Sequence, residues 1–151
     1  MSVRHRYQIF GPSFLDAAAL ADYRALPARD PEHPKQGVVG LDCEMIGVAG
    51  EGGEEVSEVA RLRVVDERGA KLFRPTRAVL DYRSSFSGVT AEMLEDAEHS
   101  ASEAVEVLSA VADRETIIIG PSAENDFRAM RLVHERVIDT SLVYNSDTKY
   151  Q

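Results

Sequence analysis

The sequence predicts a single α/β domain, on the strength of three runs of residues. Residues 37–45 (GVVGLDCEM) and 56–66 (VSEVARLRVVD) are rich in strand-favouring apolar residues, and residues 116–120 (TIIIG) form a continuous apolar run before a helical pattern. Two strands joined by a short loop indicate an antiparallel pair. A continuous apolar run is typical of a strand buried on both faces, and its order before a helix is that of α/β proteins.

We expect residues 1–36 to precede the domain, which then covers residues 37–151. Ser13 can cap a short Ala-rich helix that ends before Pro27. The following stretch, PARDPEHP at residues 27–34, has three of the six prolines and is typical of a linker.

Within the domain, residues 47–55 contain four glycines, which suggests either a phosphate cradle or a flexible hairpin loop. No Lys-Ser/Thr pair follows, so the hairpin loop is the favoured interpretation. Residues 67–69 (ERG) indicate a turn, and Leu72 and Phe73 predict a brief third strand. Residues 81–90 (DYRSSFSGVT) predict a polar loop.

The rest of the chain predicts three helices and a last short strand. Thr90 can cap a helix over residues 91–97, and Ser100 or Ser102 can cap another that ends near residue 112. Residues 124–134 have a helical apolar pattern, and Val137 begins the last strand.

Two acids, Asp42 and Glu44, stand at alternate positions of the first strand. Alternate side chains of a strand point to the same face, so the two carboxylates are aimed at one point. Like charges held this close favour either a bound cation or protonation of one group, and a hard divalent metal prefers oxygen ligands. The alternative is an exposed strand end with two solvated acids.

Asp126 opens the helix that follows the TIIIG strand. The carboxyl end of a strand and the start of the next helix face the crevice where α/β proteins bind ligands. If this strand lies next to the first one, Asp126 can join Asp42 and Glu44 around a metal pair. The alternative is an acid that stabilises the dipole of its own helix.

Composition narrows the class of protein. The 151 residues carry a net charge of −9, which argues against wrapping a polyanion through a broad basic face. No apolar run has membrane-spanning length, and the N-terminus has no secretory pattern. The single cysteine, Cys43, cannot form an internal disulfide, so we expect an intracellular, reducing compartment.

Three motifs in order resemble the DEDDh exonuclease superfamily: LDCEM, then DYRSSFSGVTAEML, then IIIGPSAENDFRAMRLVHERVIDTS. The greatest similarity is to its eukaryotic RNA exonuclease branch, with small-RNA-degrading and ribosomal-RNA-processing members. The resemblance implies a ribonuclease H-like fold, in which helices flank a mixed sheet, and removal of nucleotides from 3′ ends with two Mg²⁺ or Mn²⁺ ions. It also implies single-stranded nucleic acid, RNA above all, as the partner, and the nucleus as the location.

The same resemblance implies roles for particular residues. Asp42 and Glu44 correspond to the metal ligands of the first motif, and Asp126 to the acid of the second. Met45 would lie beside the terminal nucleotide. The loop on the substrate side would include Ser87, Gly88 and Val89.

The sequence also departs from the family pattern. The family closes its site with a His, followed five residues later by an Asp, on a C-terminal helix, and the printed sequence does not contain this motif. Gly120 is followed by Pro121 rather than by the usual His, and Ser85 replaces an Arg of the substrate loop. These departures predict a C-terminally truncated or diverged copy, or a partial gene model.

Two functions follow from this pattern. One is an impaired 3′–5′ exonuclease, and the other is a noncatalytic relative that binds nucleic acid or a protein partner. An undercovered sheet face near residues 116–120 would favour a homo-oligomer or a protein partner.

Overall fold

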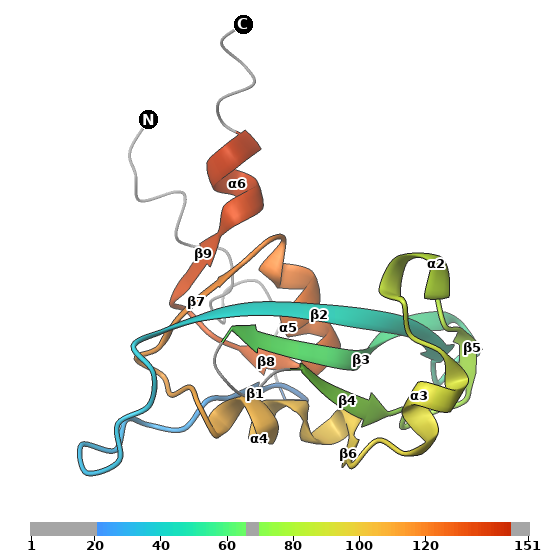
Figure 1. The fold of residues 1–151 in the computed structure, drawn as a ribbon, viewed down its shortest axis with the longest axis horizontal. Helices are drawn as coiled ribbons and strands as arrows, with labels where there is room; N and C mark the ends of the chain where they lie inside the picture. The colour runs from blue at the N-terminus through green and yellow to red at the C-terminus, as the bar shows by residue number, and fades with distance from the viewer. Residues whose placement is uncertain (1–20, 66–69, 146–151) are drawn as a thin grey trace, which may run out of the picture.

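The computed structural model describes residues 21–65 and 70–145, whose arrangement is shown in Figure 1. The main sheet has the strand order β6-β4-β3-β2-β7-β9, and β5 pairs with β2 outside this path. A separate small pair joins β1 and β8. The strands are β1 Arg24–Ala25, β2 Val38–Ala49, β3 Glu55–Val65, β4 Ala70–Arg74, β5 Val79–Asp81, β6 His99–Ser100, β7 Ile117–Gly120, β8 Leu132–Val133 and β9 Val137–Asp139.

The helices lie between and beside these strands. They are α2 Ser84–Ser87, α3 Ala91–Glu95, the 3₁₀ turn η3 Ala101–Glu103, α4 Ala104–Ser109, α5 Ala123–Met130 and α6 Thr140–Asn145. None of the helices in the described ranges is long and apolar enough to cross a membrane.

Strand directions make the sheet mixed, as the resemblance to the exonuclease superfamily implies. Strand β2 runs antiparallel to β3 and parallel to β7, which in turn runs parallel to β9. The carboxyl ends of β2, β7 and β9 therefore point the same way. Strands β7 and β9 end beside the middle of β2, just past Gly40, and the segments that follow these two strands meet there.

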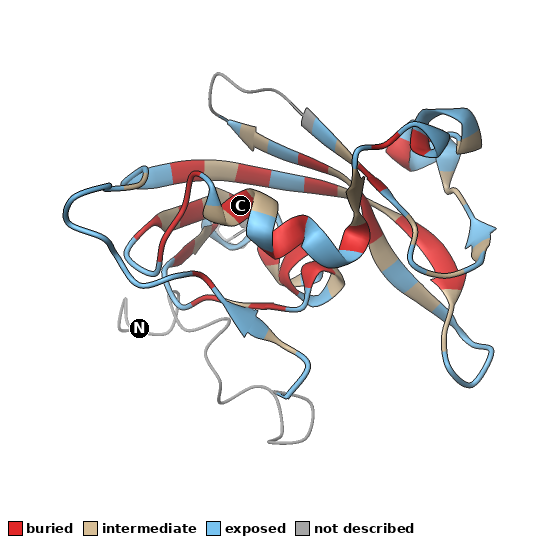
Figure 2. Cartoon of the chain, turned by 90° about the horizontal axis from the view of Figure 1, so that it is seen from below, coloured by how far each residue is buried: buried red, intermediate tan, exposed pale blue. Residues whose placement is uncertain are grey.

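Alternation along β2 builds the main core. Val39, Leu41 and Cys43 are buried on the face that α4 and α5 cover, where they pack with Leu108 and Phe127. Buried and exposed positions alternate along the strands, and the buried faces of the helices turn toward the sheet (Figure 2). The intervening positions of β2 point to the other face.

A bulge in the β2–β3 ladder allows a second, smaller core. The register shifts between Glu44 and Met45, so that Ala60 of β3 has no residue opposite it. Beyond this point Ile46 and Val48 are buried together with Ala60, Val89 and Leu94. This second cluster fixes α3 and the segment before it against the far half of β2.

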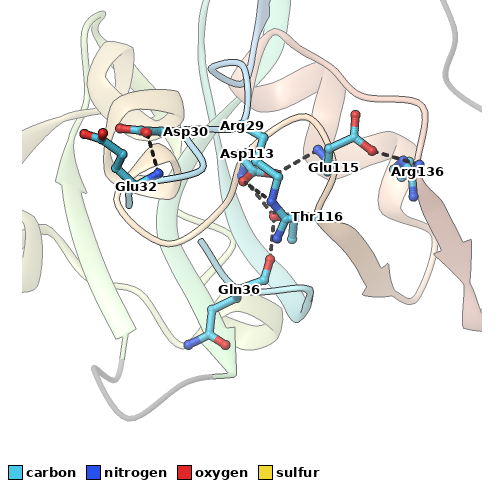
Figure 3. A network of polar contacts seen from close by, with 8 residues as sticks. All are labelled: Arg29, Asp30, Glu32, Gln36, Asp113, Glu115, Thr116 and Arg136. Atoms are coloured by element: carbon cyan, nitrogen blue, oxygen red, sulfur yellow. Dashed lines mark hydrogen bonds and ion pairs between the residues drawn. The ribbon is translucent and has the colours of Figure 1, made fainter. Parts of the chain in front are cut away.

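The segment before β2 is bonded to the turn that precedes β7 (Figure 3). The Thr116 hydroxyl donates to the Gln36 carbonyl at 2.7 Å and accepts from the Asp113 amide at 2.9 Å. Arg29 Nε lies 3.6 Å from Asp113 Oδ2. Leu26 is fully buried in the main core, so part of the segment before residue 37 packs on the domain. The domain boundary at residue 36 stays a prediction.

Several local expectations need correction. The glycine-rich loop is shorter than predicted, because β2 continues to Ala49 and β3 begins at Glu55. The polar loop at residues 81–90 contains the short helix α2. The predicted N-terminal helix and the turn at residues 67–69 lie outside the described residues, except that residues 24–25 form strand β1 rather than helix.

Strand β7 is buried on one face rather than two. Ile118 is fully buried, whereas Ile117 and Ile119 are only half-buried. On that same open face, Val38 is 52% exposed and Val65 is 80% exposed. An apolar sheet face is thus left partly open, as the sequence predicts.

Candidate metal centre and substrate cleft

Strand β2 places Asp42 and Glu44 on one side of the sheet. Their neighbours Leu41 and Cys43 are buried in the main core, so alternation turns both carboxylates to the opposite face. Asp42 is exposed and Glu44 is half-buried. Both lie past Gly40, the last β2 residue paired with β7, and before Gly47, where the pairing with β5 begins, so neither of these strands covers this edge of β2 at the two acids.

The connection from β7 to α5 brings Asp126 to that part of β2. Strand β7 ends at Gly120, where an added Cβ would stand 2.5 Å from the Leu41 carbonyl oxygen, so only glycine allows this approach. Ser122 then adopts φ 50° and α5 begins at Ala123. Asp126 follows in the first turn of α5, with only 4% of its surface exposed.

Asp126 is surrounded by negative charge. Burial and the neighbouring Asp42 carboxylate raise the pKa of Asp126 from 3.8 to about 7, although a hydrogen bond from the Cys43 amide opposes the rise. Asp139 and Glu44 raise it further. Burial, followed by the charge of Asp126, also raises the pKa of the Cys43 thiol. Asp42 and Glu44 are therefore both close enough to act on Asp126.

One carboxylate oxygen in this cluster lacks a partner. Asp126 Oδ2 is buried and accepts no hydrogen bond. A buried acceptor left unpaired costs about 1–3 kcal/mol, and a cation would satisfy it. The donors present are carboxylate oxygens, which suit Mg²⁺ or Mn²⁺ rather than a soft metal.

The ligand chemistry fits a divalent ion, but the ligand geometry is not preformed. Among the described residues, no three His, Cys, Asp or Glu side chains are already arranged to hold a metal. Asp42 is exposed, so its carboxylate is the one with freedom to turn toward an ion.

The structure adds a fourth acid, Asp139, which the sequence analysis did not select. It ends β9 and is 6% exposed. Its Oδ1 accepts hydrogen bonds from the Ser122 amide at 2.9 Å and from the Ser141 amide and hydroxyl at 2.9 and 2.6 Å. Burial raises the pKa of Asp139, but these hydrogen bonds outweigh burial and leave it below its ordinary value.

Asp139 thereby joins the start of α5 to the start of α6. The sequence signal was the Asp-Thr-Ser run after a short strand, since an Asp in this position commonly accepts backbone hydrogen bonds at a helix start. Its role here is to hold the connection between β7 and α5, the helix that carries Asp126.

A cleft of about 570 Å³ lies next to Glu44, within the size range of small-molecule sites. One wall is formed by Cys43, Met45 and Ser57, and α5 contributes Asn125, Arg128 and Ala129. The remaining wall comes from the α2 region, with Arg83, Phe86 and Ser87. Phe86 is 91% exposed at this cleft.

The predicted substrate residues fall in different places around this cleft. Met45 and Ser87 line it. Gly88 ends α2 with φ 62°, and its carbonyl accepts a hydrogen bond from Arg61 at 3.5 Å. Val89 is fully buried in the second core, so any contact it makes with a ligand would involve its backbone. Contact of these residues with substrate stays a prediction.

No histidine of the described ranges lines the cleft. His134 is 3% exposed and its Nε2 lies 2.7 Å from the Thr116 carbonyl oxygen, ahead of β7. Asp126 follows the other end of that strand. Burial lowers the pKa of His134, so this side chain is a neutral member of the core.

Comparisons with known proteins agree with this arrangement. The exonuclease family model RNase_T matches residues 39–145. RNA exonuclease 3 of Yarrowia lipolytica is 35% identical over 119 residues, which cover 71% of this chain and 15% of that protein. Small RNA degrading nuclease 2 of Arabidopsis thaliana is 37% identical over 122 residues, which cover 77% of this chain and 25% of that protein.

Solved structures show the same fold. The catalytic unit of Neurospora crassa Pan2 has a TM-score of 0.57 at 20% identity and covers 92% of this chain and 26% of the Pan2 chain. The Saccharomyces cerevisiae Pan2 module in complex with AACCAA RNA has a TM-score of 0.54 at 16% identity. The match covers 86% of this chain and 26% of the Pan2 chain. The chain thus spans about a quarter or less of these relatives.

Proposed function

The chain belongs to the exonuclease family that the RNase_T model describes, and from this premise we propose that it is a 3′–5′ exonuclease on single-stranded nucleic acid, RNA rather than DNA. The observation that carries the proposal is the buried, unpartnered Asp126 Oδ2 beside Asp42 and Glu44. The names of the relatives favour RNA.

Asp42, Glu44 and Asp126 would hold the divalent ions. When bound, two such ions supply Lewis-acid activation of water and stabilisation of the leaving oxygen. The Cys43 amide orients the Asp126 carboxylate, and Gly120 keeps α5 close enough to β2 for the acids to meet.

The cleft next to Glu44 would take the 3′-terminal nucleotide. Met45 and the exposed ring of Phe86 offer apolar surface to a base, and bases stack on aromatic side chains irrespective of sequence. Arg128 offers a guanidinium to a phosphate from the opposite wall.

Proton transfer is the weakest part of this site. Among the described residues, no histidine reaches the cleft to accept a proton from water. A general base commonly contributes about 10²–10⁴-fold to a rate. The 151-residue chain alone is therefore proposed to be slow, with a rate that rises with pH above neutrality because hydroxide replaces the base.

The test is nucleotide release from 5′-labelled single-stranded RNA in Mg²⁺ or Mn²⁺, with the matching DNA as comparison. Asp42→Asn should abolish metal-dependent digestion, and calorimetry should show weaker Mn²⁺ binding. Asp30→Asn is the matched control, since Asp30 is exposed and pairs only with the nearby Glu32 and His33 in the described structure. Equal digestion by wild type and Asp42→Asn would refute the metal site.

A noncatalytic role is the second candidate, favoured by the absence of a preformed ligand set among the described residues. It is separated from the first by extending the chain with a His-bearing segment of a family member. Digestion by the extended chain supports the exonuclease. RNA binding without digestion, even after extension, supports a binding domain.

A further inference from the structure

A second cavity lies beside the substrate cleft and is rich in arginine. It has a volume of about 280 Å³ and lies between β1, β3, η3 and the end of α5. Arg24, Arg77 and Arg131 line it together with Asp22 and Glu58. Three guanidinium groups gather here although the chain as a whole carries a charge of −9.

The two cavities are neighbours. Ala129 of α5 lines both, so the two cavities adjoin at this residue. A polymer whose end sits next to Glu44 could therefore continue past Ala129 into the second cavity.

One of the three arginines of the second cavity is left to meet a phosphate group. Arg77 makes no ion pair or hydrogen bond to any described residue that lines this cavity, whereas Arg131 Nη1 pairs with Asp22 Oδ2 at 3.5 Å. The Glu58 carboxylate accepts hydrogen bonds from the Thr76 amide and hydroxyl. Arg24 binds Glu106 and the Ser102 carbonyl, so Arg77 is the cation best placed for a ligand.

We propose that this second cavity binds the sugar-phosphate backbone of the single-stranded RNA on the 5′ side of the nucleotide held next to Glu44. The inference rests on the proposed function, because it takes the acid cleft as the place of the 3′ end. Backbone contacts to arginine position a strand without reading its sequence, so the site should accept any single-stranded sequence of sufficient length.

The test compares the affinities of the whole chain for a dinucleotide and a hexanucleotide of single-stranded RNA. Ca²⁺ replaces Mg²⁺ or Mn²⁺, since it takes the same oxygen ligands, and the recovered RNA is checked for length. Wild type should bind the hexanucleotide more tightly. Arg77→Gln should lower the ratio of the two affinities about tenfold and reduce the salt dependence of hexanucleotide binding by about 0.7 in log–log slope.

Two further variants sharpen the result. Arg74→Gln removes an exposed arginine of β4 that lines neither cavity and should leave the ratio as in wild type. Ala129→Glu places a carboxylate at the junction and should lower the ratio more than the similarly sized Ala129→Gln, because charge rather than bulk repels phosphate.

Each outcome decides between the two ideas. A wild type that binds both lengths equally, or an Arg77→Gln ratio equal to that of Arg74→Gln, overturns the second site while the exonuclease proposal stands. Failure of the wild type to bind or digest RNA of any length in the presence of metal refutes the proposed function itself.

Discussion

Replacing Asp126 with asparagine should stabilise the metal-free protein at alkaline pH. The carboxyl of Asp126 has a pKa of about 7 in the folded chain against 3.8 as its ordinary value. Between these values the folded state binds the proton more strongly than the unfolded state, so the free energy of unfolding falls as pH rises through this window. The stabilising contribution is complete below pH 3.8 and is lost above about pH 7.

The magnitude follows from the width of that window. A shift of roughly three pKa units corresponds to about 4 kcal/mol at about 1.36 kcal/mol per unit. The amide introduced by Asp126→Asn carries no charge, and its oxygen can still accept the hydrogen bond from the Cys43 amide. The variant should therefore gain up to about 4 kcal/mol over wild type between about pH 4 and about pH 8.

The assay is urea unfolding of both proteins in EDTA across this pH range, analysed as the difference between variant and wild type. His134 has a lowered pKa, which makes stability rise with pH as the unfolded state loses its proton, but it is present in both proteins and cancels in the difference. Glu124→Gln is the matched control, because it removes another acid from the first turn of α5. A difference that stays constant with pH would refute the reasoning.

Metal should reverse the order of stability. An ion that binds the folded chain alone stabilises it by mass action, and Asp126→Asn removes one of the proposed ligands. Saturating Mn²⁺ should thus raise the unfolding free energy of wild type more than that of Asp126→Asn. Equal stabilisation of the two proteins by Mn²⁺ would remove Asp126 from the ligand set.

Three other outcomes are expected. Asp113→Ala should lower the unfolding free energy by about 2 kcal/mol in urea titrations, because Asp113 is 1% exposed and accepts a hydrogen bond from the Glu115 amide at 2.8 Å. Asp113→Asn keeps an acceptor oxygen and should lower the unfolding free energy less. Equal losses in the two variants would contradict this reasoning. Wild type should show concentration-dependent self-association in sedimentation velocity that Val65→Lys weakens and Leu80→Lys, on β5, does not; a wild-type monomer at every concentration would count against it. Digestion should be faster in Mn²⁺ than in Mg²⁺, because Mg²⁺ demands stricter octahedral geometry and the ligands are not preformed; equal rates would indicate a rigid site.

The sequence predicted those parts of the fold that depend on local patterns. Runs of strand-favouring apolar residues predicted β2 and β3, the short loop between them predicted their antiparallel pairing, and the TIIIG run predicted β7. The polar residues at 81–90 predict a loop, but the structure has the short helix α2 there. The ends of α2 are set by positive φ values at Arg83 and Gly88, which a polar composition does not indicate. The half-buried state of Ile117 and Ile119 depends on which elements cover the sheet. An apolar run in the sequence does not contain that information.

The sequence predicted the site residues that alternate along one strand. It could not place those residues that come together only when distant strands pair. Asp42 and Glu44 follow from alternation alone. Asp126 required β7 to lie beside β2, which the parallel pairing shows. Asp139 required a further neighbour, β9. It acts on the site through its hydrogen bond to Ser122 and through its charge, which raises the pKa of Asp126. Both acids belong to the same edge of the sheet, yet burial without full hydrogen bonding raises the pKa of Asp126, whereas three hydrogen bonds keep the pKa of Asp139 low. Burial, the nearby Asp42 charge and the missing hydrogen bond together leave Asp126 with an oxygen to offer a metal. The hydrogen bonds of Asp139 make it the group that holds the loop between β7 and α5 in place.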